Sequence, residues 1–352
     1  MTVFLWIVLA VSLFEPVYTY VMYPFLLAGF RRKNYKKSEY MPKVSVIILG
    51  HHPEAKIKNL YEQEYFLENI SVQTEKTANG TDLSKAEKIN NLISDAQGEI
   101  ILFTDDKTRL DKEALKKMAA NFSDSRVGSV CGQIRKENGQ ESAYWKYENW
   151  VREQEGKIGR VSGANSFLFA IRKEAVSKIP QNTINRNFFL STAVIKSGWD
   201  AVFERNAIAY EQSDNTSAEI FNKHVEEGAG YYQALWIFRK MLLPSRGSFT
   251  YISHRVMKWI VPFNMIAAFF SSALLGSRYK WVHILFLSQL AGYIILGIYA
   301  KARSCKKEIK GSIGKLLSLM QYFAALNLSY LIGLGELLFK RKKFDEYNQK
   351  KH

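Results

Sequence analysis

The sequence has few residues of the kind that cross-link or ligate a small domain. Only two of its 352 residues are cysteine, Cys131 and Cys305, and they form no C-x-x-C pair. This excludes a disulfide framework and a cysteine-ligated zinc site. The sequence also contains no internal repeat and no low-complexity segment. Hydrophobic residues make up 47% of the chain, which supplies a sizeable core and excludes wholesale disorder.

The net charge of +16 is concentrated in three segments. Residues 31–37 carry five basic side chains and no acidic one, 301–315 carry six basic and one acidic, and 340–351 carry six basic and two acidic. Residues 41–240 have no net charge. Basic residues that flank apolar segments are typical of membrane anchoring, so we expect a lipid bilayer and no nucleic acid as a partner.

Four apolar stretches are long enough to be membrane helices. The first contains a single charged residue, Glu15. A cleaved signal peptide is disfavoured there, because the start is not basic, the apolar run is long and the basic segment 31–37 follows it. The positive-inside rule then places the residues after 31 in the cytoplasm. We expect the basic, aromatic stretch 248–259 to lie in the membrane interface as an amphipathic helix. The four apolar stretches are 3–30, 259–276, 281–300 and 316–339.

Residues 42–240 alternate between strand-like and helix-like patterns. The continuous apolar runs at 44–49 and 99–104 are typical of buried parallel strands, so we expect an α/β domain that binds ligands at the carboxyl ends of its strands. This divides the chain into an N-terminal anchor with its basic flank (1–37), the α/β domain (42–240), and an interface helix followed by C-terminal membrane segments (241–352). Further strands are predicted at 69–73, 127–134, 167–171 and 201–203, and helices from the first strand to about 66 and at 84–97, 112–122, 142–154 and 189–197.

Two short motifs stand where such a domain binds its ligands. Asp105 and Asp106 end the second apolar run and are placed to hold a divalent ion against a diphosphate, although their spacing alone slightly favours a solvated turn or a cap on the helix at 112. Gly163, Ala164 and Asn165 precede an apolar strand. Their backbone is suited either to close approach of a sugar or phosphate, or to a tight turn.

The order of the segments resembles that of family 2 glycosyltransferases. MPKVSVIILGHHPE is similar to the opening strand and turn of that family, FTDDKTRLDKEAL to its Asp-x-Asp strand end, and RVSGANSFLFAIRKEA to its Gly-Ala loop. GYYQALW and ISHRVMKWIVPF resemble the closing segment and membrane entry of membrane-bound polysaccharide synthases. The resemblance runs in the same order from about 42 to 340.

This resemblance implies a GT-A fold and transfer of a sugar from a nucleotide-sugar donor, in polysaccharide or glycolipid synthesis. It further implies a multi-pass protein of the inner (cytoplasmic) membrane whose GT-A domain is cytoplasmic. Mg²⁺ or Mn²⁺ would be held at Asp105. The implied donor-binding residues are Glu54, Lys85, Asp105, Asp106 and Lys107, and the implied acceptor-side residues are Gly163, Ala164, Asn165 and Gln233.

The sequence departs from the family at the positions that carry its chemistry. Lys107 stands where the family has its second metal-side Asp, and Asn187 stands at the position of the catalytic base. An amide cannot accept the acceptor proton, and no Asp or Glu occurs between Glu174 and Asp200. Three hypotheses follow: an active glycosyltransferase, a non-catalytic partner of another glycosyltransferase or a polysaccharide export component, and a module that binds the sugar donor without turnover.

Overall fold

The core of the protein is a seven-stranded mixed sheet with the strand order β2-β1-β3-β6-β5-β7-β4. β1 pairs in parallel with β2 and β3, β5 pairs in parallel with β7, and β6 runs antiparallel to both of its neighbours. β4 adds an antiparallel strand at the edge. The strands are β1 Val44–Leu49, β2 Ile70–Thr74, β3 Ile100–Asp105, β4 Thr108–Leu110, β5 Val127–Lys136, β6 Leu168–Arg172 and β7 Asp200–Glu211.

In this computed structural model the described residues are all except 51, 75–82, 138–142, 166, 213–216, 246, 305–310 and 340–352. The basic segment 340–351, Cys305 and much of the basic loop 301–315 therefore lie outside them.

Both faces of the sheet are covered by helices, which explains why β1 and β3 read as continuous apolar runs. On β1, Val46 and Ile48 belong to a core cluster with α3 and α5, whereas Ile47 belongs to the opposite cluster with α4 and α7. The helices of this domain are α3 Glu54–Tyr61, α4 Lys85–Asp95, α5 Ala114–Ala120, α6 Ala143–Lys157, α7 Arg186–Lys196 and α8 Ser217–Ile237. The predicted α/β class is confirmed.

The structure differs from the sequence-based prediction at two strands. β4 was not predicted, and the strand predicted at 201–203 runs from Asp200 to Glu211. Both differences concern the same edge, because β4 pairs with the second half of β7. Glu204 and Arg205, which come just before that half, interrupt the apolar pattern of the strand.

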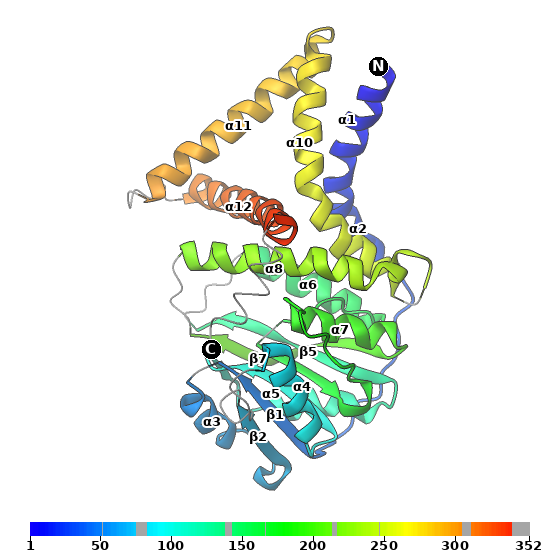
Figure 1. Cartoon of the computed structure of the whole chain (residues 1–352), viewed down its shortest axis with the longest axis vertical. Coiled ribbons are helices and arrows are strands. Elements are labelled where there is room, and N and C mark those ends of the chain that lie inside the picture. Colours follow the sequence, from blue (N-terminus) through cyan, green and yellow to red (C-terminus); the bar gives the residue numbers. More distant parts are fainter. Residues whose placement is uncertain are drawn as a thin grey trace.

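Four helical segments are long and apolar enough to cross a membrane, namely Thr2–Ala28, Ser248–Gly276, Lys280–Arg303 and Gly311–Phe339. α1 and α10 lie side by side and rise from the sheet domain, and α12 packs on α8 (Figure 1). Gly228 and Gly333 allow this last contact, because a Cβ atom on Gly333 would come within 2.6 Å of the α8 backbone. The helices are α1 Thr2–Val17, α2 Tyr23–Ala28, α9 Ser248–Thr250, α10 Met257–Gly276, α11 Lys280–Ser304 and α12 Gly311–Phe339, with π-helical turns at Tyr18–Met22 and Tyr251–Val256.

The stretch 248–259 is not a separate amphipathic helix as expected. It continues through the π-helical turn into α10, and Tyr251 and Trp259 are buried in the same cluster as the sheet domain. The basic residues of this stretch, which suggested a membrane surface, face carboxylates of the sheet domain instead.

The linker 31–43 has no regular secondary structure and is held by ion pairs along the sheet domain. Lys33 Nζ lies 2.7 Å from a carboxylate oxygen of Asp200, and Lys37 Nζ lies 2.6 Å from Glu204. Burial alone raises the pKa of Asp200, but Lys33 and Arg160 outweigh it and hold the pKa below its ordinary value. The basic flank after the first helix is therefore part of the folded domain.

We expect the substitution Asp200→Asn to weaken this attachment. Asp200 is fully buried and also bonds Arg160 at 2.6 Å, so the substitution removes the negative charge that both Lys33 and Arg160 face and costs about 3 kcal/mol of unfolding free energy. Trypsin should then cut the linker faster in folded, detergent-solubilised protein. Lys116→Met, which breaks the exposed pair with Glu39, is the control and should change stability by less than about 1 kcal/mol. Equal cleavage rates in the two variants would contradict the assignment.

Candidate functional site

The carboxyl ends of β1 and β3 meet at a turn that is closed by Asp106. Its backbone N–H donates to Leu49 O at 3.0 Å, and its Oδ2 accepts the N–H of His52 at 2.9 Å. Gly50 has φ of +128°, and a Cβ atom there would overlap the Asp106 carboxylate. Position 50 therefore requires glycine, and the hydrogen bonds of Asp106 stabilise the turn.

Asp105 is the carboxylate at this edge that is suited to a ligand. Its Oδ1 accepts the backbone N–H of Lys107 at 2.7 Å. Burial raises the pKa of Asp105, the Lys107 N–H opposes that rise, and the charge of Asp106 adds to it. Such a carboxylate is stabilised by a nearby cation.

The described residues contain no cluster of three or more His, Cys, Asp or Glu that could enclose a metal ion. Mg²⁺ commonly takes one or two carboxylates and completes its shell with water and substrate phosphates. One carboxylate at a strand end, beside an open edge, fits that kind of ion. Asp105 is therefore a fitting ligand for an ion that arrives with a diphosphate.

A buried lysine that the sequence analysis did not predict lies beside these carboxylates. Lys56 of α3 donates to Thr108 Oγ1 at 2.8 Å and is almost fully buried. Burial lowers its pKa to about 7, although Asp105 and Asp106 oppose the shift. Lys56 shares the buried face of α3 with Leu60, four residues on, where the pattern of a surface helix predicts an apolar residue.

The other predicted donor-binding residues lie at or near the same edge. Glu54 is exposed at the start of α3, and the side chain of Lys107 is exposed. Lys85 begins α4 next to a capping box formed by Ser84 and Glu87. Among the described residues no ion pair joins Lys85 to Asp105, and its donor-binding role stays a prediction.

The predicted acceptor-side turn, Gly163, Ala164 and Asn165, is held by three different elements. Gly163 has φ of +79°, and Ala164 N–H donates to Ser191 Oγ of α7 at 3.1 Å. Asn165 Nδ2 donates to Gly132 O of β5 at 2.7 Å, while its Oδ1 accepts the N–H of Leu168 at 2.8 Å. The side chain of Asn165 is thus engaged by the protein itself, and its role toward an acceptor stays a prediction.

The start of α7 carries the position predicted for the base. Asn185 caps the helix by accepting the N–H of Phe188 at 3.1 Å, and Asn187 lies in the first turn. Gln233 of α8 supports this start, because its Oε1 accepts the N–H of Ile184 at 2.9 Å. Gln233 therefore positions the loop before α7.

A cavity opens between α6, α8, α10 and α12, on the membrane-helix side of the sheet domain. Arg152 lines it, is only 7% exposed, and has no hydrogen-bond partner for Nε and Nη1 among the described residues. Its guanidinium carbon lies 5.8 Å from the ring of Trp145. The lining residues are Tyr144, Trp145, Glu148, Arg152, His224, Glu227, Tyr231, Arg255, Lys258, Trp259, Tyr322, Leu326 and Tyr330. Nothing in the sequence pattern alone brings these four helices together.

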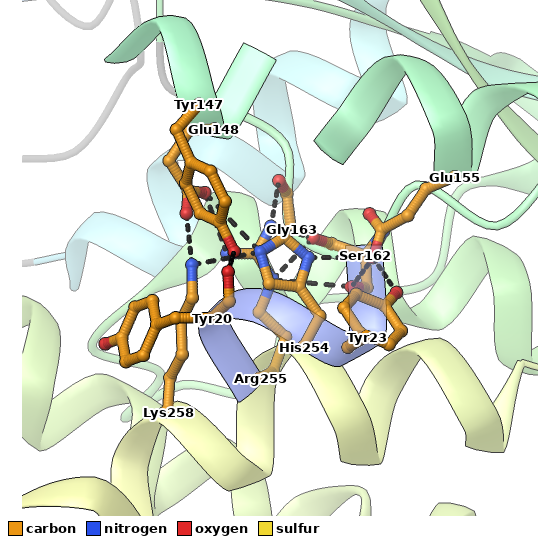
Figure 2. A network of polar contacts seen from close by, with 10 residues as sticks. All are labelled: Tyr20, Tyr23, Tyr147, Glu148, Glu155, Ser162, Gly163, His254, Arg255 and Lys258. Atoms are coloured by element: carbon orange, nitrogen blue, oxygen red, sulfur yellow. Dashed lines mark hydrogen bonds and ion pairs between the residues drawn. The ribbon is translucent and has the colours of Figure 1, made fainter. Parts of the chain in front are cut away.

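A buried charge cluster joins α6 to the π-helical turn and α10 beside this cavity (Figure 2). Lys258 forms an ion pair with Glu148, and His254 Nδ1 lies 2.7 Å from Glu155 Oε1. Burial alone raises the pKa of Glu148, but Lys258 and His254 outweigh it and hold the pKa well below its ordinary value. His254 and Arg255 lower the pKa of Glu155 against the same burial.

Two further contacts extend the cluster to other segments (Figure 2). Arg255 donates to the carbonyl oxygen of Ser162, directly before the turn at Gly163. Tyr23 of α2 donates to Glu155 at 2.6 Å. Arg255 thereby links the start of α10 to the predicted acceptor-side turn, and Tyr23 links α2 to α6.

The fold and this edge define the class of protein. A mixed sheet that ends in carboxylates at β3, flanked by long apolar helices, is a GT-A fold of the nucleotide-diphospho-sugar transferase type. Residues 73–207 match the family model described as Glycosyl transferase family 2. No curated protein matches the chain by sequence.

Of three similar solved structures, the first supports the fold. The mannosyltransferase PcManGT from Pyrobaculum calidifontis, in complex with GDP-Man and Mn²⁺, is 15% identical with a TM-score of 0.67, and the match covers 95% of this chain and 99% of that chain. TarS 1–349 from S. aureus, in complex with UDP-GlcNAc, is 16% identical with a TM-score of 0.43, covering 86% and 92%. GalNAc-T7 with UDP, GalNAc and Mn²⁺ is 13% identical with a TM-score of 0.35, covering 55% and 50%. The predicted GT-A fold is confirmed.

We expect Glu148→Gln to destabilise the protein by about 3–5 kcal/mol, because it leaves Lys258 buried without its counter-ion. The pKa values of Glu148 and Glu155 are lower in the folded than in the unfolded chain. Their stabilisation is therefore complete above the unfolded pKa and is lost as the pH falls through the folded value. Melting temperatures of detergent-solubilised protein, measured from neutral pH to well below the unfolded glutamate pKa of about 4.3, follow this loss.

The melting temperature of Glu148→Gln should depend less on pH than that of the wild type. Glu153→Gln is the matched control on α6, because Glu153 pairs with Lys157 and Arg205 at the surface. It should behave like the wild type. A Glu148→Gln protein as stable as this control would contradict the proposed importance of the cluster.

Proposed function

We propose that this protein is a membrane-bound glycosyltransferase that transfers a sugar from a nucleotide-diphospho-sugar donor during polysaccharide or glycolipid synthesis. The observation that carries the proposal is Asp105 at the end of β3, inside a domain that matches family 2 glycosyltransferases. Burial penalises the charge of Asp105, and a cation at this strand end would offset that penalty and, through its own charge, attract a diphosphate. The fold-level likeness to a mannosyltransferase solved with GDP-Man and Mn²⁺ supports this choice of donor class.

The donor in this proposal lies across the ends of β1 and β3. Asp105 would hold Mg²⁺ or Mn²⁺, which supplies charge neutralisation to the departing diphosphate when bound. Asp106 keeps the β1 turn closed, and Lys56 adds positive charge below it. Glu54, Lys85 and Lys107 are proposed donor contacts from the surrounding rim.

The sheet domain faces the cytoplasm in this proposal, and the apolar helices anchor it to the inner (cytoplasmic) membrane. The four apolar helical segments support membrane association. The basic linker 31–43, which is folded against the sheet domain, supports the cytoplasmic location, because basic residues next to membrane helices are enriched on the cytoplasmic side. A donor made in the cytoplasm then reaches the strand ends directly.

A second function is favoured by one specific observation. The start of α7 carries Asn187 where the family has its base, and no carboxylate occurs between Glu174 and Asp200. The alternative is a non-catalytic partner of a second glycosyltransferase or of a polysaccharide export component. Such a partner would have the GT-A fold but would not transfer sugar itself.

The donor site is tested by calorimetry on the full chain in detergent, with UDP and a panel of UDP- and GDP-sugars, with and without Mn²⁺. We expect metal-dependent binding that Asp105→Asn weakens by about tenfold or more, since the substitution removes the charged ligand. Asp95→Asn, at the exposed end of α4, is the matched control and should bind like the wild type. Folded wild-type protein that binds no donor would refute the donor site.

The alternative is tested by affinity purification of the tagged full chain from its native membrane at native expression. Co-purification of a second glycosyltransferase or an export protein, together with absent sugar transfer by this chain alone, is the result expected of a non-catalytic partner. Purification of this chain by itself would count against that function.

A further inference from the structure

Two residues of α8 form a hydrogen-bonded pair that faces the cavity. His224 Nδ1 lies 3.2 Å from Glu227 Oε2, and the spacing of three residues places both side chains on one face of the helix. Their side chains are 21% and 29% exposed, and both line the cavity. The pair is therefore accessible to a ligand and not sealed in the core.

The surroundings of the pair keep Glu227 ionised. Burial alone raises its pKa, but His224, Lys223 and Arg152 outweigh it and hold the pKa below the ordinary value. An ionised carboxylate accepts a hydrogen bond from Nδ1–H, which leaves the lone pair of the imidazole on Nε2. Other titratable or charged groups that line this cavity are Tyr144, Glu148, Tyr231, Arg255, Lys258, Tyr322 and Tyr330.

One side of the His224–Glu227 pair leads to the carboxyl ends of β1 and β3, where the donor is proposed to bind and which we call the donor edge. Lys223, directly before His224, has its Nζ 4.7 Å from the ring centroid of Phe167. The carbonyl of Phe167 accepts the hydroxyl of Thr104 at 2.9 Å, and Thr104 precedes Asp105 in β3. The positive charge of Lys223 partly opposes the rise that burial causes in the pKa of Asp105. The first half of α8 therefore passes over the edge where the donor is proposed to bind.

The other side connects to the start of α7. Phe188, next to Asn187, packs edge-on against Tyr231 and Trp259 with ring centroids 5.3 and 5.6 Å apart. Tyr231 and Trp259 both line the cavity, and Tyr231 lies two turns after His224 on α8. Two rings that line the cavity thus pack against the helix start that carries an amide at the predicted base position.

We propose that His224 is the general base of the transfer reaction, that Glu227 is its positioning residue, and that the acceptor hydroxyl binds in this cavity. This inference rests on the proposed function. His224 Nε2 takes the proton of the acceptor hydroxyl as the acceptor oxygen bonds to C1 of the sugar. The bond from C1 to the diphosphate oxygen breaks, and its electron pair leaves with the nucleoside diphosphate. Glu227 stabilises the imidazolium that forms.

Arg152 gives a second and independent sign that the cavity binds a ligand. A buried guanidinium with two nitrogen atoms lacking hydrogen bonds pays a desolvation cost that an oxygen-rich ligand removes. Arg152 lies on α6, opposite the pair on α8. A hydroxyl-rich or acidic acceptor satisfies Arg152 and presents a hydroxyl to His224 at once.

The test uses host membranes that contain the full chain, which serve as the source of both enzyme and acceptor. Radiolabelled UDP- and GDP-sugars are added with Mn²⁺, and label is counted in solvent-extractable and precipitated material from acid to alkaline pH. Donor affinity is measured separately by calorimetry on the purified chain. The variants are His224→Gln, Glu227→Gln and, as the matched control, His283→Gln, whose histidine lies in α11 outside the cavity.

We expect His224→Gln to lower kcat by about 10²–10⁴-fold, leave donor affinity within about twofold, and abolish the decline of activity toward acid pH. Glu227→Gln should lower kcat by about tenfold or more and change the pH profile, with donor affinity unchanged. His283→Gln should match the wild type. A purely structural role of His224 would not move the pH profile.

Transfer by His224→Gln within about twofold of the wild type at every pH would overturn the base while the proposed function stands. If the His224→Gln protein does not accumulate, an unchanged rate and pH profile in Glu227→Gln would instead overturn the assignment of His224 as the general base. Donor binding without transfer by the wild type also overturns the base and favours the non-catalytic alternative. Absence of both binding and transfer refutes the proposed function itself.

Discussion

The buried charge cluster between α6 and the start of α10 is the contact on which the arrangement of the protein depends. Charges that are removed from water require partners in good geometry, and Lys258, His254 and Arg255 find them on α6 and at residues 162–163. Because these partners belong to the sheet domain, the membrane-helix segment has one orientation against it. Any displacement would leave ions unpaired at a site that solvent does not reach.

The cavity follows from that orientation. With α10 held against α6, α8 closes one side and α12 the other, and Gly228 and Gly333 let these last two helices approach closely. Aromatic rings from all four helices line the space, among them the stacked pair Tyr231 and Trp259 with ring centroids 5.3 Å apart. What is left open is lined by charged and hydroxyl groups, which suits a polar acceptor held at the level where the domain meets the membrane helices.

The two halves of the proposed reaction thus occupy different layers. The donor edge belongs to the sheet, where a strand end and a glycine turn present Asp105. The cavity belongs to the helices above it. α8 is the element shared by both, since Lys223 faces the donor side and His224 the cavity. A base on α8 would replace the carboxylate that the start of α7 lacks, so the departures from the family pattern are compatible with a retained activity.

The sheet domain, its strand ends and the apolar helices can be predicted from the sequence, because the apolar side chains at 44–49, 99–104 and 3–30 must be shielded from water in any fold. Local rules also located Asp105, which directly follows a buried strand. Tertiary structure alone decided the antiparallel edge of β4, the docking of 248–259, and the cavity with His224, Glu227 and Arg152. These depend on contacts between residues that are far apart in the sequence, such as Arg152 on α6 and His224 on α8, and pairing at that range leaves no local pattern.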